Sequence, residues 1–149
     1  MKTIRRTTSH YLLTALAFVC TTEVEAGAAC AVAKRFGNSL AIEWVVDAKE
    51  SAAGAQRKSM QKLLAQGYRK KGQDVFSQAA TATALPHVVI IETTYTTRTG
   101  RQRTSYGCGF STRSSQDAER SAIRNLRTHS WGWRPELGYK VIFRGGQTP

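Results

Sequence analysis

The stretch that most constrains the fold covers residues 105–143, because its pattern predicts a strand, a capped helix and a second strand. Side chains alternate in residues 105–110, which indicates a strand. Ser114 and Asp117 have the Ser-x-x-acid spacing of a helix N-terminus, and residues 139–143 have the composition of a returning strand. Three apolar side chains recur at four-residue steps and give the helix one apolar face: Ala118, Ala122 and Leu126.

A second copy of this unit is predicted in residues 40–91. A shift of 63 residues superposes Ser51 on Ser114 and Leu63 on Leu126. Asp47 is expected to cap the first helix. Two pseudo-repeated strand–helix–strand units predict an α+β domain, with about five mainly antiparallel strands packed with two helices.

Residues 1–26 have the features of a secretory signal peptide. Three basic residues precede an apolar run, residues 12–20, which is too short to span a bilayer. Two cleavage positions fit the small-x-small rule, one after Ala26 and one after Ala28. The mature chain, residues 27–149, is therefore predicted to be a single α+β domain that is secreted or periplasmic.

The net charge of the whole chain is +12. Residues 1–26 hold three basic and two acidic side chains, so the mature chain keeps a net charge of +11. A charge of this size favours anionic partners, such as an acidic protein, a nucleic acid, an envelope polymer or a lipid surface. Composition does not choose among these partners, and solvated surface charge is the alternative interpretation.

Two cysteines, Cys30 and Cys108, remain after removal of the signal peptide. In an oxidising compartment their default state is a disulfide. Closing a loop of about 80 residues would stabilise the fold by about 4 kcal/mol on the chain-entropy model. A nucleophilic or metal-bound thiol is the alternative, but no histidine lies near either cysteine in the sequence.

The first two predicted strands form a hairpin around residues 37–38, a Gly-Asn pair that suits a tight turn. In that register Ala31 lies opposite Trp44, so small residues face large ones. Between the first helix and the next strand, residues 68–86 are predicted to form a long loop. A loop that interrupts a repeat is either a site of function or a tolerated insertion.

The strongest strand signal is in residues 87–97, which are rich in β-branched side chains. Residues 98–101 then form a turn, and the resulting register places Tyr95 opposite Thr104. Three arginines gather at this turn, where they can contact one anion or simply keep the hairpin tip solvated: Arg98, Arg101 and Arg103.

Two further groups of residues are candidates for binding an anionic partner. A basic stripe on the outer face of the second helix could contact phosphates or an acidic surface, and a solvated face is the alternative: Arg120, Arg124 and Arg127. Beyond that helix, Trp131 and Trp133 lie beside Arg134 and could stack on bases or sugars. Packing of the helix end on the sheet is the other explanation for both tryptophans.

A catalytic set could be formed only by His87, Glu92 and His129 together with a hairpin arginine, as in a small ribonuclease. His87 and Glu92 are five residues apart on a strand and therefore point to opposite faces. His129 falls on the apolar side of its helix. The sequence has no dinucleotide fingerprint, phosphate-binding loop or metal-binding histidine spacing. It therefore assigns no catalytic residue, metal or cofactor, and it favours a protein without enzymatic activity.

The segment Tyr-Gly-Cys-Gly-Phe at 106–110, followed by Ser-Gln-Asp-Ala-Glu at 115–119, resembles small secreted bacterial domains of unknown function. Those families repeat a strand, a helix with spaced alanines and a strand, and cysteines tie the copies together. The resemblance implies a compact α+β sandwich over most of residues 30–143, and it implies no assigned activity.

These features predict an exported basic binding protein, such as an inhibitor or immunity-type partner of an acidic protein. Two alternatives stay open. A secreted nuclease-like effector would need a histidine, a carboxylate and arginines in one cleft, whereas a binder of anionic polymers would present a basic face with exposed tryptophans. The sequence indicates neither the identity of the partner nor the oligomeric state.

Overall fold

The computed structural model describes residues 27–83 and 87–146. The predicted signal peptide, residues 1–26, lies outside the described residues. Among the helices that are described, none is long and apolar enough to cross a membrane.

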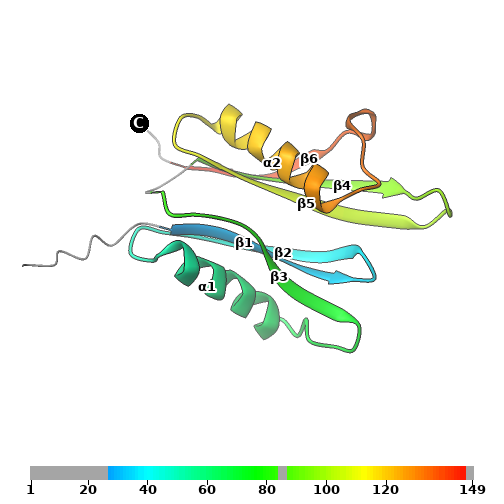
Figure 1. The fold of residues 1–149 in the computed structure, drawn as a ribbon, viewed down its shortest axis with the longest axis horizontal. Helices are drawn as coiled ribbons and strands as arrows, with labels where there is room; N and C mark the ends of the chain where they lie inside the picture. The colour runs from blue at the N-terminus through cyan, green and yellow to red at the C-terminus, as the bar shows by residue number, and fades with distance from the viewer. Residues whose placement is uncertain (1–26, 84–86, 147–149) are drawn as a thin grey trace, which may run out of the picture.

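Six strands form two antiparallel three-stranded sheets, and two helices accompany them (Figure 1). This arrangement confirms the predicted α+β class and corrects the predicted count of about five strands. The first sheet has the strand order β2-β1-β3 and comes from β1 (Gly27–Arg35), β2 (Asn38–Asp47), α1 (Ala52–Ala65) and β3 (Gln73–Thr81). The second has the order β5-β4-β6 and comes from β4 (His87–Thr96), β5 (Gln102–Ser111), α2 (Ser115–His129), the short 3-10 helix η1 (Pro135–Leu137) and β6 (Lys140–Gly145).

The predicted long loop at residues 68–86 is wrong, because Gln73–Thr81 forms β3 and pairs antiparallel with β1. Every residue of β1 from Ala28 to Ala33 is fully buried, and such a strand needs backbone partners on both of its edges. The sequence of β3 has few β-branched residues, so pairing with β1 stabilises it where local propensity does not.

The two sheets pack face to face, and each helix covers the outer face of its own sheet (Figure 1). The apolar run of β4 explains this layering, because alternate side chains point to opposite faces. Val89 and Ile91 pack against α2 in one cluster. Val88 and Ile90 belong to a second cluster, between the sheets, with partly buried aromatic residues from both sheets. Burial of β4 on both faces is the reason that its sequence is continuously apolar.

A disulfide between Cys30 and Cys108 joins the two sheets, as the sequence predicted. The Cα atoms are 6.6 Å apart and the residues are 78 positions apart in the chain. The bond links the central strand of the first sheet to β5 of the second. The loop that it closes includes most of the domain.

Serine side chains cap both helices. The predicted cap at Ser114 is confirmed, since its Oγ accepts a hydrogen bond from the backbone N–H of Asp117 at 3.1 Å. The predicted cap at Asp47 is wrong, because Ser51 Oγ accepts the bond from Gly54 N–H at 3.1 Å. Asp47 ends β2 and its carboxylate accepts from the N–H of Lys49 at 2.9 Å instead, a local turn that stops the helix from starting earlier.

Both predicted hairpin registers are wrong by one residue. Cys30, not Ala31, lies opposite Trp44, because the first turn uses residues 36–37 and a register shift follows Ala33. In the second hairpin Tyr95 lies opposite Arg103 instead of Thr104. There the loop is one residue shorter than predicted, since the Thr97 N–H donates to the Arg101 carbonyl at 2.8 Å and leaves only residues 98–100 in the loop.

Close contact between α2 and β5 explains the Gly-x-Gly pattern in β5. A Cβ atom on Gly107 would lie 2.3 Å from the Ala122 carbonyl oxygen, and one on Gly109 would lie 1.9 Å from that of Ala118. Asn125 of α2 then reaches the edge of β5, where its Oδ1 accepts from the N–H of Cys108 at 3.0 Å and from Gln78 of β3 at 2.7 Å. These bonds satisfy polar groups where the two sheets meet.

Candidate anion-binding site

Four loops meet at one end of the long axis of the molecule (Figure 1). We call this the basic end and define it by residues 36–37, 66–72, 97–101 and 130–139. Side-chain to backbone bonds hold the two hairpin tips together: Arg103 donates to the carbonyl of Phe36, and the Thr104 N–H donates to Asn38 Oδ1 at 2.7 Å. The Phe36 ring also lies against Gly72, so the loop at residues 66–72 is in contact with the first hairpin tip.

A groove of about 860 Å³ lies between these loops. It is lined by residues of three of the four loops and of the adjoining strands, among them Phe36, Tyr95, Arg98, Arg103, Trp131 and Arg134. Guanidinium groups and aromatic rings therefore surround the same space. Such a lining suits a ligand or surface that combines negative charge with apolar or planar groups.

Two aromatic side chains of the groove are unusually exposed. Trp131 is 99% exposed and Phe36 is 75% exposed. Phe36 also has a backbone φ of 49°, a left-handed conformation that costs a residue with a Cβ roughly 1–2 kcal/mol. Neither burial nor turn propensity explains a phenylalanine at this position, and such combinations concentrate at functional sites.

The loop that presents Trp131 is fixed by buried neighbours. Trp133 is 6% exposed and its Nε1 donates to the Gly138 carbonyl at 2.9 Å. Ser130 Oγ donates to the hydroxyl of Tyr95 at 3.1 Å. A Cβ atom on Gly132 would lie 2.5 Å from the Tyr95 ring, so only glycine allows this close approach. The exposed indole is therefore carried on a well-packed support.

The charge of the basic end is one-sided. Its loops hold one acidic residue, Glu136, and six basic ones: Arg69, Lys70, Lys71, Arg98, Arg101 and Arg134. Within the described ranges, none of these six makes an ion pair with a carboxylate. Two of the six, Arg98 and Arg134, line the groove together with Glu136, and the other four lie in the loops around it. This excess of cations creates a positive potential that attracts anions.

Some of the residues predicted to bind an anionic partner lie together at the basic end. Arg98, Arg103 and Trp131 line the groove, and Arg101 lies in the same hairpin loop. The prediction that Trp133 binds a partner is wrong, because its indole packs in the core with Tyr95 and supports the loop. The three predicted arginines of α2 lie apart from the groove. Arg124 and Arg127 are exposed, and Arg120 pairs with Asp117.

Sequence reasoning missed Phe36 and the loop at residues 66–72. Neither Phe36 nor the cations of that loop were among the predicted binding residues. One signal was available for each. A bulky residue directly before Gly37 in a hairpin is unusual, and the run Arg69-Lys70-Lys71 adds three like charges to one short connection.

The predicted catalytic candidates are not assembled. His129 lies at the end of α2, where its ring is 6.2 Å from that of Phe76 and its carbonyl accepts from Lys34 Nζ at 3.1 Å. Burial, and then the charge of Lys34, lowers the pKa of His129. His87 starts β4 at the opposite end of the molecule, beside Gly146.

Glu92 has a third environment. It pairs across the strands with Tyr106, and burial of that phenol, with Glu92 as the second cause, raises the pKa of Tyr106 to about 12. No cleft among the described residues therefore unites a histidine, this carboxylate and a hairpin arginine. Nor do the described residues contain a group of three metal-ligating side chains.

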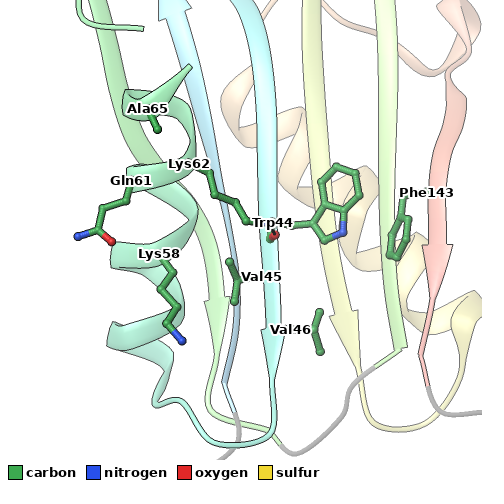
Figure 2. Close-up of a pocket in the computed structure, with 8 residues that line it drawn as sticks. All are labelled: Trp44, Val45, Val46, Lys58, Gln61, Lys62, Ala65 and Phe143. Atoms are coloured by element: carbon green, nitrogen blue, oxygen red, sulfur yellow. Dashed lines mark hydrogen bonds between the residues drawn. The ribbon is translucent and has the colours of Figure 1, made fainter. Parts of the chain in front are cut away.

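A second groove, of about 670 Å³, lies beside β2 and is predominantly apolar (Figure 2). Trp44 of β2 points toward Phe143 of β6, and the two ring centroids are 4.8 Å apart. Its two lysines are neutralised: Lys58 pairs with carboxylates at 3.2 and 2.6 Å, and Lys62 pairs with Glu43 at 3.6 Å. This groove therefore lacks the free positive charge of the groove at the basic end.

Searches for similar proteins found no matching family model, no matching curated protein and no matching solved structure. The function must therefore be argued from the geometry and charge of the basic end.

Proposed function

We propose that the protein is an exported binding protein without catalytic activity, and that its basic end holds an anionic partner. The observation that carries this proposal is the groove at the basic end, where Arg98, Arg103 and Arg134 surround exposed aromatic rings. Glu136 is the only carboxylate among the residues that line this groove, and none of the three arginines forms an ion pair within the described residues. The groove therefore keeps an excess of positive charge for a negative partner.

Export is supported by the disulfide between Cys30 and Cys108, because such bonds persist in oxidising compartments. The predicted signal peptide at residues 1–26 is consistent with the same destination. The absence of catalysis is part of the proposal and rests on the separation of His87, Glu92 and His129.

The finer description of the fold is also a proposal. Each half has the order strand, strand, helix, strand, with its first strand in the centre of its sheet. The two caps, Ser51 and Ser114, are separated by the 63 residues of the sequence shift. We infer that the halves are pseudo-repeats, and this inference agrees with the resemblance to small secreted bacterial domains.

The test compares two triple variants. Replacing Arg98, Arg101 and Arg134 by alanine removes charge from the basic end, whereas replacing Arg120, Arg124 and Arg127 removes the same charge from α2. With heparin as a soluble polyanionic probe, the basic-end variant should lose affinity by about 10-fold and show a weaker dependence on salt. Arg103 is left intact because it also holds Phe36.

The control variant should bind heparin nearly as well as the unmodified protein. The basic-end variant should keep the melting temperature of the unmodified protein, since exposed charges contribute little to stability. The α2 variant should lose only the small contribution of the ion pair between Arg120 and Asp117. Loss of binding in the α2 variant alone, or no heparin binding by the unmodified protein at low salt, would contradict the proposal.

A further inference from the structure

Among the described residues, the most exposed large apolar side chains are at the most positively charged end of the molecule. In residues 27–83 and 87–146, Trp131 and Phe36 have the largest exposed fractions of the large apolar residues. Leu137, which is 48% exposed, also lines the groove. Three apolar side chains on loop tips are therefore surrounded by arginines and lysines. Their exposure to water is unfavourable unless a partner covers them.

The geometry points to a bilayer surface containing anionic lipids as the partner of the basic end, with Trp131 and Phe36 inserted between the headgroups. This inference rests on the proposed function and names its partner. Tryptophan prefers the interface between water and lipid, because its ring is apolar and its N–H is polar. Arginine and lysine side chains beside it would contact the lipid phosphates.

The exposure of Trp131 argues against a stacking site for bases or sugars. A stacking platform needs a ring whose orientation is fixed by protein behind it. An indole that is 99% exposed has almost no protein contact, so no fixed ring face is available to a base. A fluid headgroup layer imposes no such requirement, because it adapts to the side chain.

The shape of the basic end also favours a bilayer. It consists of loop tips from both halves, at one end of the long axis (Figure 1). A rigid protein partner would need a complementary surface of about 800 Å² on each side. A deformable lipid surface can instead contact separate tips of unequal height.

The strands keep the basic end apart from the acidic residues at the other end. β1 alone has nine residues, which at 3.3 Å per residue extend over about 30 Å. The Debye length is about 8 Å at physiological ionic strength. Carboxylates at the far end therefore do not neutralise the basic end. The charge asymmetry would orient the molecule with its long axis perpendicular to the bilayer surface.

Binding to two kinds of vesicle tests the inference. One kind contains equal parts of phosphatidylglycerol and phosphatidylcholine, and the other contains phosphatidylcholine alone. Sedimentation should show binding to the anionic vesicles and little binding to the neutral ones. The tryptophan emission should shift to shorter wavelength on binding, because the exposed indole of Trp131 enters an apolar environment.

The variant Trp131→Ala should reduce binding to anionic vesicles by about 10-fold and abolish the emission shift. Its heparin affinity should stay within about twofold, because the arginines remain. The matched control is Ile142→Ala, which removes an exposed apolar side chain of β6 outside the basic end. It should bind vesicles as the unmodified protein does.

The possible results separate this inference from the proposed function. Heparin binding without vesicle binding overturns the inference and leaves the proposed function standing. Vesicle binding that is unchanged in Trp131→Ala also overturns it, because the basic end would then hold anions through charge alone, without ring insertion. Equal binding to neutral vesicles overturns the requirement for anionic lipid, and binding to neither probe overturns both proposals.

Discussion

The two ends of the molecule use similar residues in opposite ways. At the far end, which we call the paired end, carboxylates near the helix N-termini neutralise nearby cations. Lys58 pairs with both Asp47 and Glu50. Asp117 pairs with Arg113 at 3.3 Å and with Arg120. Glu119 pairs with Arg144 at 2.6 Å. At the basic end six loop cations have no such partners among the described residues.

Backbone chemistry differs between the ends in the same direction. The paired end follows ordinary rules, with Ser51 and Ser114 as helix caps and Asp117 in the positive first turn of α2. The basic end places Phe36 in a left-handed turn and leaves Trp131 in water. Local rules are kept where charge serves stability and broken where we propose that the protein binds, as is expected of a functional site.

The largest expected effect is a difference in stability between the buried tryptophan that supports the basic end and the exposed tryptophan on its surface. We expect Trp133→Ala to lower the free energy of unfolding by about 3–5 kcal/mol, because it leaves a cavity in the core beside Tyr95. Trp131→Ala should change the same quantity by less than about 0.5 kcal/mol, since that side chain is almost fully exposed. Chemical denaturation of both variants measures the difference.

Equal losses of stability in these two variants would mean that Trp131 is packed in solution. In that case its exposure could not be explained by a partner. The disulfide should remain intact during the measurement, so that both variants are compared with the same cross-linked unfolded state.

Local signals predicted some elements correctly. The helix α2 was predicted from Ser114, Asp117 and a four-residue apolar spacing, all of which act within one or two turns. The disulfide was predicted because two cysteines in an oxidising compartment leave one pairing. The cause of the helix lies in the residues named, whereas the disulfide joins residues 78 positions apart and was predictable only because the count of cysteines left one pairing.

Other features depended on distant contacts. β3 forms because the buried strand β1 requires a second partner, and nothing within Gln73–Thr81 indicates that. The hairpin registers depended on the exact loop, and a bulge or a change of one residue in loop length shifts them. Arg98, Arg103 and Trp131 were predicted individually, but their convergence with Phe36 results from the packing of the two sheets.

The second effect should appear on acidification and should come from the paired end. A hydrogen bond from Arg120 lowers the pKa of Asp117, and one from Arg144 lowers the pKa of Glu119. The pKa of Asp47 is lowered first by its bond from the Lys49 N–H and then by Lys58. Because these folded pKa values lie below the unfolded ones, the stabilisation is present above about pH 5 and is lost as the pH falls through the folded values.

Melting temperatures measured between pH 7 and pH 3 test this expectation. We expect the melting temperature of the unmodified protein to fall on acidification, and the profile of Asp117→Asn to be flatter. The control Glu136→Gln removes the loop carboxylate of the basic end, which has no ion pair within the described residues. A profile for Glu136→Gln as flat as that of Asp117→Asn would show that the two ends do not differ in this respect.

The smallest effect should have the opposite sign and should come from the turn at Phe36. Asparagine tolerates positive φ better than phenylalanine, and the Phe36 ring gives little burial in return, since it is 75% exposed. We expect Phe36→Asn to raise the free energy of unfolding by about 0.5 kcal/mol, after allowing for the lost contact with Gly72.

The same variant should bind anionic vesicles more weakly, because one of the two inserted rings is absent. Phe36→Leu is the matched control: it keeps an apolar side chain and the strained turn, so it should retain most of the binding and gain no stability. Denaturation and vesicle sedimentation on the same samples give both quantities. A Phe36→Asn protein that is less stable than the unmodified one would mean that the ring is required for folding, and the strained turn would then need no explanation from binding.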